Sequence, residues 1–247
     1  MGESAFQWAP GHWQNWREAS NPYRRFKSER DRTLALQALQ LRERDSVLEV
    51  GCGYGWVSKS LFEAAKIHWV GVDQSESMVR QLRVSLEVHR PTALVSEGGK
   101  LPFRSESFDK VLCTGVLMHI ADDFSVLREM QRVLRPGGLL LCSLNSLWSP
   151  ASWVEWLRTR FRGNYVHNYR RPAVYRRYLE GLGLRIQHVA GDGLFSTSVL
   201  RFGRFGFPPR RTFPILRFLD AWAVERFPEL AHEVWFTAVK PSDQSRS

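Results

Sequence analysis

The feature that most constrains this chain is a run of alternating glycines, Gly51, Gly53 and Gly55, directly after a short apolar segment. That segment, residues 46–50, is rich in valine and leucine, as expected of a strand buried on both faces. Glycine adopts backbone conformations closed to other residues, so it permits a sharp turn and a close approach of backbone to ligand. Residues 56–66 then carry apolar side chains at helical spacing. The stretch predicts a strand, a glycine turn and a helix in succession.

A second apolar run, residues 67–72, ends at Asp73, about 20 residues past the glycines, where an acid in a βαβ unit accepts hydrogen bonds from ribose hydroxyls. The predicted helix beside the turn would present free N–H groups and its positive dipole end. Together these features predict an adenosine-like ligand. A dinucleotide site is one alternative, although its fingerprint is G-x-G-x-x-G and this chain has G-C-G-Y-G after Glu49. A structural turn without ligand is the other alternative.

Residues 48–55, LEVGCGYG, resemble the first motif of the class I S-adenosylmethionine (SAM) dependent methyltransferases. Three further stretches match this family in order and spacing: residues 70–78, 101–120 and 127–145. The resemblance is to the small-molecule type with a methyltransferase domain 11-like core. It implies an α/β fold, a Rossmann-like three-layer sandwich around a seven-stranded, mostly parallel sheet whose last strand is antiparallel. It also implies SAM as the cofactor.

The resemblance implies roles for individual residues. The glycine turn would hold the methionine part of SAM, Asp73 the ribose, and Glu97 with Gly98 the adenine, although family members commonly carry Asp where this chain has Glu97. Met78 can reach the adenine face or serve as a core methionine. Tyr23 is placed where related enzymes touch the methionine end, and core packing is its alternative role. The candidate cofactor-binding residues are Tyr23, Glu49, Gly51, Cys52, Gly53, Gly55, Asp73, Gln74, Met78, Glu97, Gly98 and Thr114.

The segment from Thr114 to His119 follows the fourth predicted strand. Ligands of open α/β sheets lie outside the carboxyl ends of the strands, so this segment should border the transferred methyl group. His119 is its only titratable side chain, and histidine suits a general base near neutral pH. Support of the loop is the alternative role. Some quinone O-methyltransferases of this family bind a divalent ion through Glu residues just ahead of that histidine, where this chain has Gly115, Val116 and Met118, so we expect no metal.

We expect one domain with decorations. Residues 1–45 should form an aromatic N-terminal arm, over residues 1–28, and a helix that serves as a lid or packs on the sheet edge. Residues 46–145 should form the SAM-binding core, and residues 146–247 the rest of the domain, with acceptor-binding insertions at 146–170 and 191–231. Further strands are predicted at 92–96, 108–113, 139–144, 184–189 and 234–239, and helices at 29–41, 74–88, 124–134, 172–182 and 215–227.

The net charge of +10 is unevenly distributed. Residues 46–150 carry 11 basic and 11 acidic side chains, whereas residues 151–247 carry 16 and 8. The excess in the last third could meet an anionic substrate, a membrane surface or nucleic acid, or be solvated. No run is long enough to span a membrane and the N-terminus lacks a signal-peptide pattern, so a cytoplasmic location is expected.

Three functions follow from these observations. The first is transfer of a methyl group from SAM to a small, lipophilic or aromatic acceptor, because aromatic and apolar residues accompany the arginines of the last third. Such a reaction needs chiefly alignment of the nucleophile and exclusion of water. The second is an RNA-modifying methyltransferase that uses the basic last third, and the third is a noncatalytic SAM-binding module. The predicted partners are the small acceptor and, peripherally, a membrane surface, with nucleic acid ranked below them.

Overall fold

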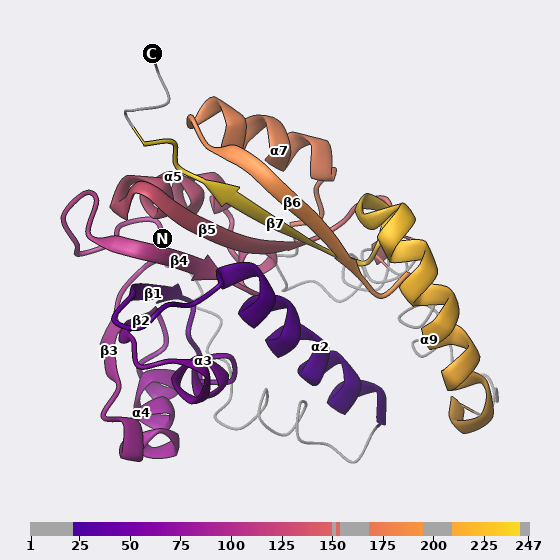
Figure 1. Ribbon diagram of the computed structural model, residues 1–247, viewed down its shortest axis with the longest axis horizontal. Coiled ribbons are helices and arrows are strands. Elements are labelled where there is room, and N and C mark those ends of the chain that lie inside the picture. The colour runs from indigo at the N-terminus through magenta and orange to yellow at the C-terminus, as the bar shows by residue number, and fades with distance from the viewer. Residues whose placement is uncertain (1–21, 150–151, 154–167, 195–208, 243–247) are drawn as a thin grey trace, which may run out of the picture.

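The computed structural model describes residues 22–149, 152–153, 168–194 and 209–242. Its centre is a seven-stranded sheet with the order β3-β2-β1-β4-β5-β7-β6. Strands β3 to β5 pair in parallel, and β7 pairs antiparallel with both β5 and β6 (Figure 1). This confirms the predicted mostly parallel sheet with an antiparallel last strand.

The described elements have the following bounds. The strands are β1 (Ser46–Val50), β2 (His68–Asp73), β3 (Thr92–Val95), β4 (Phe108–Cys113), β5 (Leu134–Asn145), β6 (Arg185–Asp192) and β7 (Glu233–Val239). The helices are α2 (Pro22–Leu39), α3 (Ser58–Ala64), α4 (Glu76–Ser85), α5 (Asp123–Val133), α7 (Pro172–Gly181) and α9 (Pro209–Arg226), with the 3₁₀ helices η1 (Glu87–His89), η2 (Leu117–His119) and η4 (Pro228–Leu230).

Two hydrophobic layers enclose the sheet, because successive side chains of a strand point to opposite faces. On β5, Leu139 and Leu141 join the layer that contains residues of α2, α3 and α4. Leu140, Cys142 and Leu144 join the opposite layer, which contains residues of α5 and α7. The result is the three-layer sandwich that the sequence predicts. The carboxyl ends of β1, β2 and β4 lie at one edge of this sandwich.

The structure corrects three boundaries. Helix α2 starts at Pro22, within the predicted arm, since proline suits the first position of a helix. Helix α3 covers only Ser58–Ala64, so its dipole is weaker than the predicted helix over 56–66 would give. Strand β5 begins at Leu134, before the predicted start at residue 139, and its pairing with β4 is irregular between the pairs Phe108–Leu134 and Lys110–Leu139.

Several predictions fall outside the described residues. These are the aromatic arm before residue 22 and most of both insertions, at residues 154–167 and 195–208. Among the described residues, no helix combines the length and apolar character needed to cross a membrane.

Candidate active site

The glycine turn lies between the end of β1 and the start of α3. Gly51, Gly53 and Gly55 all have positive φ, at 73°, 52° and 89°, a region that favours glycine. The N–H groups of Gly51 and Cys52 both donate to the carbonyl of Val72, at 2.7 and 3.0 Å, which fastens the turn to the end of β2. The loop is therefore held by the neighbouring strand, as a ligand-binding turn needs to be.

Two of these glycines also meet specific spatial demands. A Cβ atom on Gly51 would lie 2.3 Å from Val116 Cγ2, so the turn and the loop after β4 pack too closely for any side chain there. At Gly53 a Cβ atom would meet no heavy atom within 4 Å. Gly53 thus exposes its backbone to open space, whereas Gly51 allows two loops to meet.

Asp73 is locked to the glycine turn by its own carboxylate. Its Oδ2 accepts a hydrogen bond from the Gly53 N–H at 2.9 Å, and its Oδ1 accepts one from the Ser75 N–H at 2.8 Å. Burial raises the pKa of Asp73, and the two N–H donors oppose that rise. Each carboxylate oxygen can accept a second hydrogen bond, so the pair can still bind a diol.

Glu49 supplies buried negative charge at the end of β1. Only 3% of it is exposed, and its Oε2 accepts from the Ser58 hydroxyl at 2.6 Å and from Trp69 Nε1 at 3.1 Å. Burial raises the pKa of Glu49 to about 7, against the effect of these donors. No ion pair within the described part of the chain includes Glu49. A cationic ligand group beside it would favour its charged form.

These groups share one pocket at the carboxyl edge of the sheet. It encloses about 980 Å³ of space between the protein atoms, including the part that is open to solvent at its mouth. Four segments form its wall: the glycine turn, the end of β2 with the start of α4, the loop after β3 and the loop after β4. The lining residues are Glu49, Val50, Gly51, Cys52, Gly53, Tyr54, Trp56, Asp73, Gln74, Met78, Ser96, Gly98, Thr114, Gly115, Val116, His119 and Ile120.

Most of the predicted site residues therefore come together, but Gly55 and Glu97 do not line this pocket. Gly55 packs against α4 and the residues after it, because a Cβ atom there would lie 2.7 Å from Leu86 Cδ1. Glu97 is exposed to solvent, and its neighbours Ser96 and Gly98 line the pocket in its place. Tyr23 lies in α2, and its side chain is outside the described residues.

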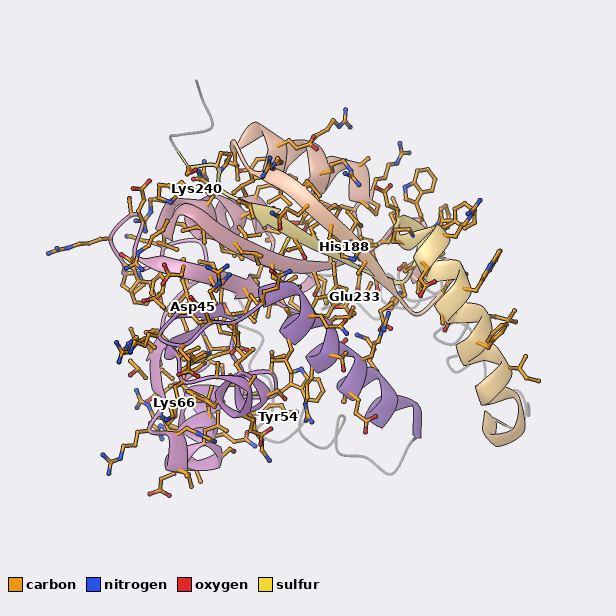
Figure 2. All side chains as sticks on the ribbon, viewed as in Figure 1. Asp45, Tyr54, Lys66, His188, Glu233 and Lys240 are labelled. Carbon is orange, nitrogen blue, oxygen red and sulfur yellow. The ribbon has the colours of Figure 1, made fainter. Side chains whose placement is uncertain are left out.

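Five lining residues were not predicted from the sequence: Val50, Tyr54, Trp56, Ser96 and Ile120. Trp56 follows the glycine turn directly, and the Arg32 guanidinium of α2 lies over its ring, 4.4 Å from the centroid. Figure 2 shows Tyr54 between the ribbons of α3 and α2. The two aromatic residues at the glycine turn could have indicated pocket-lining side chains, since such side chains cannot pack inside the tight turn itself.

The loop after β4 holds the candidate base. His119 ends η2, and its backbone N–H donates to the Val116 carbonyl at 2.8 Å. Asn168 holds this loop from the far side, because its N–H donates to the Met118 carbonyl at 2.8 Å and its side-chain amide donates to the Ile120 carbonyl. The half-buried imidazole thus lies on the pocket wall in a loop fixed at both ends, where it can take a proton from a bound acceptor.

A network of charged side chains also holds the loop after β4 in place. The Asp123 carboxylate, fully buried at the start of α5, accepts two hydrogen bonds of 2.9 Å from the Arg170 guanidinium. It also accepts one from the Tyr175 hydroxyl. On the strand side, the Gly115 N–H donates to the Ser143 hydroxyl on β5 at 2.9 Å. These contacts join the loop to α5, α7 and β5 and so fix its position.

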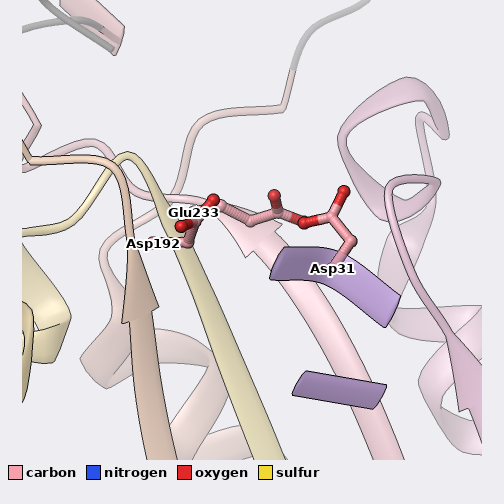
Figure 3. A group of neighbouring side chains, drawn as sticks. All are labelled: Asp31, Asp192 and Glu233. Carbon is pink, nitrogen blue, oxygen red and sulfur yellow. The ribbon is translucent and has the colours of Figure 1, made fainter. Parts of the chain in front are cut away.

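A second group of titratable side chains lies between α2 and the ends of β6 and β7. Asp31, Asp192 and Glu233 are buried and lie close together (Figure 3), with ligand atoms all within 4.8 Å of one another. Lys27 forms ion pairs with all three, at 3.2 Å for Asp192. Although burial alone would lower it, the pKa of Lys27 is raised by these three carboxylates. The ammonium group therefore supplies the positive charge here and ties α2 to the sheet.

Comparison with known proteins identifies the family. A protein family described as "Methyltransferase domain" matches this chain over residues 48–142. A methyltransferase without assigned activity from Mycolicibacterium gilvum is 30% identical over 186 residues, which are 74% of this chain and 70% of that protein. Demethylmenaquinone methyltransferase from Listeria monocytogenes is 32% identical over 135 residues, 51% of this chain and 56% of its own length.

Solved structures agree on the fold. Magnesium protoporphyrin IX methyltransferase from Synechocystis, with bound SAH, matches with a TM-score of 0.64 at 15% identity and covers 92% of each chain. The pocket fits such a cofactor, since Asp73 can bind a diol and Glu49 offers negative charge to a cation. The chain belongs to the class I SAM-dependent methyltransferase family, and it is a methyltransferase with S-adenosylmethionine as its cofactor.

Proposed function

We propose that this enzyme transfers the methyl group of SAM to a small, lipophilic or aromatic acceptor that binds against the loop after β4. The observation that carries the proposal is the composition of that part of the pocket wall. Val116 and Ile120 give it apolar surface, while Thr114 and His119 add one hydroxyl and one imidazole. A wall that combines apolar side chains with two polar groups suits a small organic acceptor, whose orientation the polar groups would fix.

The relatives support the same acceptor class. The Listeria protein is named for demethylmenaquinone, an aromatic ring on a lipophilic tail, and the match to it covers 51% of this chain. The basic last third leaves RNA as an alternative acceptor, but the described loop after β4 carries no Lys or Arg. A location in the cytoplasm stays a prediction.

We assign roles by position. The backbone of the glycine turn contacts the methionine part, Asp73 the ribose hydroxyls, and Ser96 with Gly98 the adenine edge. Glu49 balances the positive charge of the bound cofactor. SAM supplies a methyl group already activated on a sulfonium: the acceptor forms a bond to the methyl carbon while the S–CH₃ bond breaks and sulfur keeps the electron pair. His119 takes the proton that the acceptor loses.

Turnover with a defined set of acceptors tests this function. Formation of demethylated cofactor would be measured with a reduced demethylnaphthoquinone, with a small aliphatic amine and with bulk tRNA. We expect turnover with the quinol and none with tRNA. Turnover with tRNA that falls steeply with salt would instead establish the RNA alternative.

The role of His119 is tested separately with His119→Gln. As general base it contributes about 10²-fold or more to kcat, so the variant should lose that factor and the rise of kcat with pH, at unchanged SAM affinity. A matched control is His68→Gln, because His68 is exposed at the start of β2. If kcat stays within about twofold of the parent enzyme at every pH, the base role of His119 is wrong.

A further inference from the structure

Helix α9 presents an apolar stripe to solvent. Ile215, Phe218, Leu219 and Trp222 follow the spacing i, i+3, i+4, i+7, which places them along one side of a helix. They are 63%, 74%, 42% and 60% exposed. Single exposed apolar residues are common on proteins, but a contiguous row of four large ones marks an interaction surface.

The opposite side of α9 makes the contacts that hold the helix to the domain. Ala223 and Val224 are buried, and the inward-facing Asp220 accepts a hydrogen bond from the Leu194 N–H at 3.1 Å. The helix packs on β6 and on η4. Figure 1 shows α9 at the margin of the molecule, beside the end of β6, on the side away from α4. The stripe is therefore not the face through which α9 packs on the domain.

The segment of the sequence that contains the stripe has an excess of positive charge. Residues 195–226 contain six arginines and two acids, and one of those acids is the buried Asp220. Arg226 is exposed at the end of the helix, four residues after Trp222. A helix with an aromatic and aliphatic side, within a segment rich in arginine, has the composition of helices that lie in the interface of anionic membranes.

We propose that the outer stripe of α9, Ile215, Phe218, Leu219 and Trp222, docks this enzyme on an anionic lipid bilayer. The apolar side chains enter the boundary between headgroups and acyl chains, and the surrounding arginines contact the anionic headgroups. This docking goes beyond the proposed function, since it requires neither cofactor nor acceptor. It would bring the enzyme to the phase in which a lipophilic acceptor dissolves.

Two other occupants fit the charge or the chemistry less well. In a symmetric dimer built on this stripe, the arginine-rich segment of one copy would face the same segment of the other. Like charges facing each other oppose association. RNA would be attracted by the arginines, but Ile215 and Leu219 offer no ring on which a base could stack.

The test is binding to vesicles in the absence of SAM and acceptor. The full chain would be cosedimented with vesicles made of equal parts phosphatidylcholine and phosphatidylglycerol, and with vesicles of phosphatidylcholine alone. We expect binding to the anionic vesicles that weakens as salt is raised. The double variant Phe218→Ser/Trp222→Ser should lower the partition coefficient by about tenfold or more, because two large apolar anchors are lost.

The matched control is Val84→Ser/Val88→Ser. These two valines are 77% and 93% exposed, and they lie in and just after α4, on the other side of the molecule (Figure 1). The control should bind vesicles like the parent chain. Both variants should keep the thermal unfolding temperature and the SAM affinity of the parent, which shows that any loss of vesicle binding is not a loss of fold.

Three results would overturn the proposal. Equal binding of the stripe variant and the parent chain would mean that another surface binds lipid or that the chain itself covers the stripe. Equal binding to neutral and anionic vesicles would remove the role of charge. A dimer of the parent chain in light scattering, together with a monomer of the stripe variant, would show that the stripe binds a second copy of the chain. None of these results depends on which acceptor is methylated.

Discussion

The backbone N–H of Gly53 donates a 2.9 Å hydrogen bond to the Asp73 carboxylate, across the edge between β1 and β2. This bond joins the two halves of the cofactor pocket before any ligand binds. The turn would otherwise have to be ordered during binding, at a cost of about 1 to 2 kcal/mol for each residue fixed. The pocket wall is thus preorganised by its own polar groups.

Removing the Asp73 carboxylate should weaken cofactor binding. In Asp73→Ala the ribose hydroxyls and the Gly53 N–H lose their acceptor, so the affinity for SAM should fall by about 1 to 3 kcal/mol. Isothermal calorimetry measures this change. Glu76→Ala is the matched control, since Glu76 lies three residues further on in an exposed ion pair with Arg80. Equal affinities of Asp73→Ala and the parent enzyme would show that Asp73 does not contact the cofactor.

The affinity for SAM should rise with pH through about 7, the pKa to which burial raises Glu49. Below that pKa the carboxyl group is protonated in the free enzyme and must lose its proton to face a cation, so binding releases protons there. Calorimetry in buffers of different ionisation enthalpy measures that release. In Glu49→Gln both the release and the pH dependence from this group should disappear. A proton release that persists unchanged in Glu49→Gln would assign it to another group.

Glu49 should lower the stability of the ligand-free protein above neutral pH. The pKa of about 7 in the folded protein lies above the ordinary glutamate pKa of 4.5, so the folded state holds the proton more tightly and stability falls as pH rises from about 4.5 to about 7. The loss approaches about 3 kcal/mol when complete. In urea unfolding without ligand, Glu49→Gln should therefore be more stable than the parent at pH 8. This advantage over the parent should be smaller at pH 5. A difference that does not change with pH would contradict this explanation.

Alanine at the two glycines of the turn should have different effects. Gly53→Ala meets no neighbouring atom, so only its positive φ opposes the change, at a cost of about 1 kcal/mol of stability. Gly51→Ala adds a contact of 2.3 Å with Val116 Cγ2 and should cost clearly more. Gly53→Ala should still weaken SAM binding, because its methyl group takes up space at the pocket wall. Thermal unfolding and calorimetry separate the two effects, and equal destabilisation by both variants would contradict the packing argument.

Replacing Lys27 should weaken the attachment of α2 to the sheet. In Lys27→Met three buried carboxylates lose the ammonium group that they share, and Arg30, 3.9 Å from Asp192, pairs with one of them only, so the change should cost about 3 to 5 kcal/mol of stability at pH 8. The loss should shrink as pH falls, because protonation removes the repulsion, and burial already raises the pKa of Asp192. The control Lys59→Met removes an exposed pair with Glu63 and should leave stability nearly unchanged. A loss independent of pH would mean that packing, not charge, is what Lys27 supplies.

The sequence could predict the cofactor half of the site because that half is encoded locally. Strand, glycine turn, helix and acid follow one another within residues 46–73, and hydrogen bonds of the βαβ unit bring the ends together whatever surrounds them. The sequence could not predict which side chains face the pocket in the loop after β3, because this loop has no regular alternation: Ser96 and Gly98 line the pocket, and Glu97 is exposed to solvent.

The tertiary structure alone decided the contacts between segments far apart in the chain. The sequence holds no local sign that Lys27 meets Asp192 and Glu233, or that Arg32 stacks on Trp56, because these pairs depend on where α2 crosses the sheet. It also could not show which side of α9 faces solvent, since that helix is apolar on both sides and only its packing on β6 makes the choice. Local periodicity specifies elements and their order, whereas long-range packing specifies which faces meet.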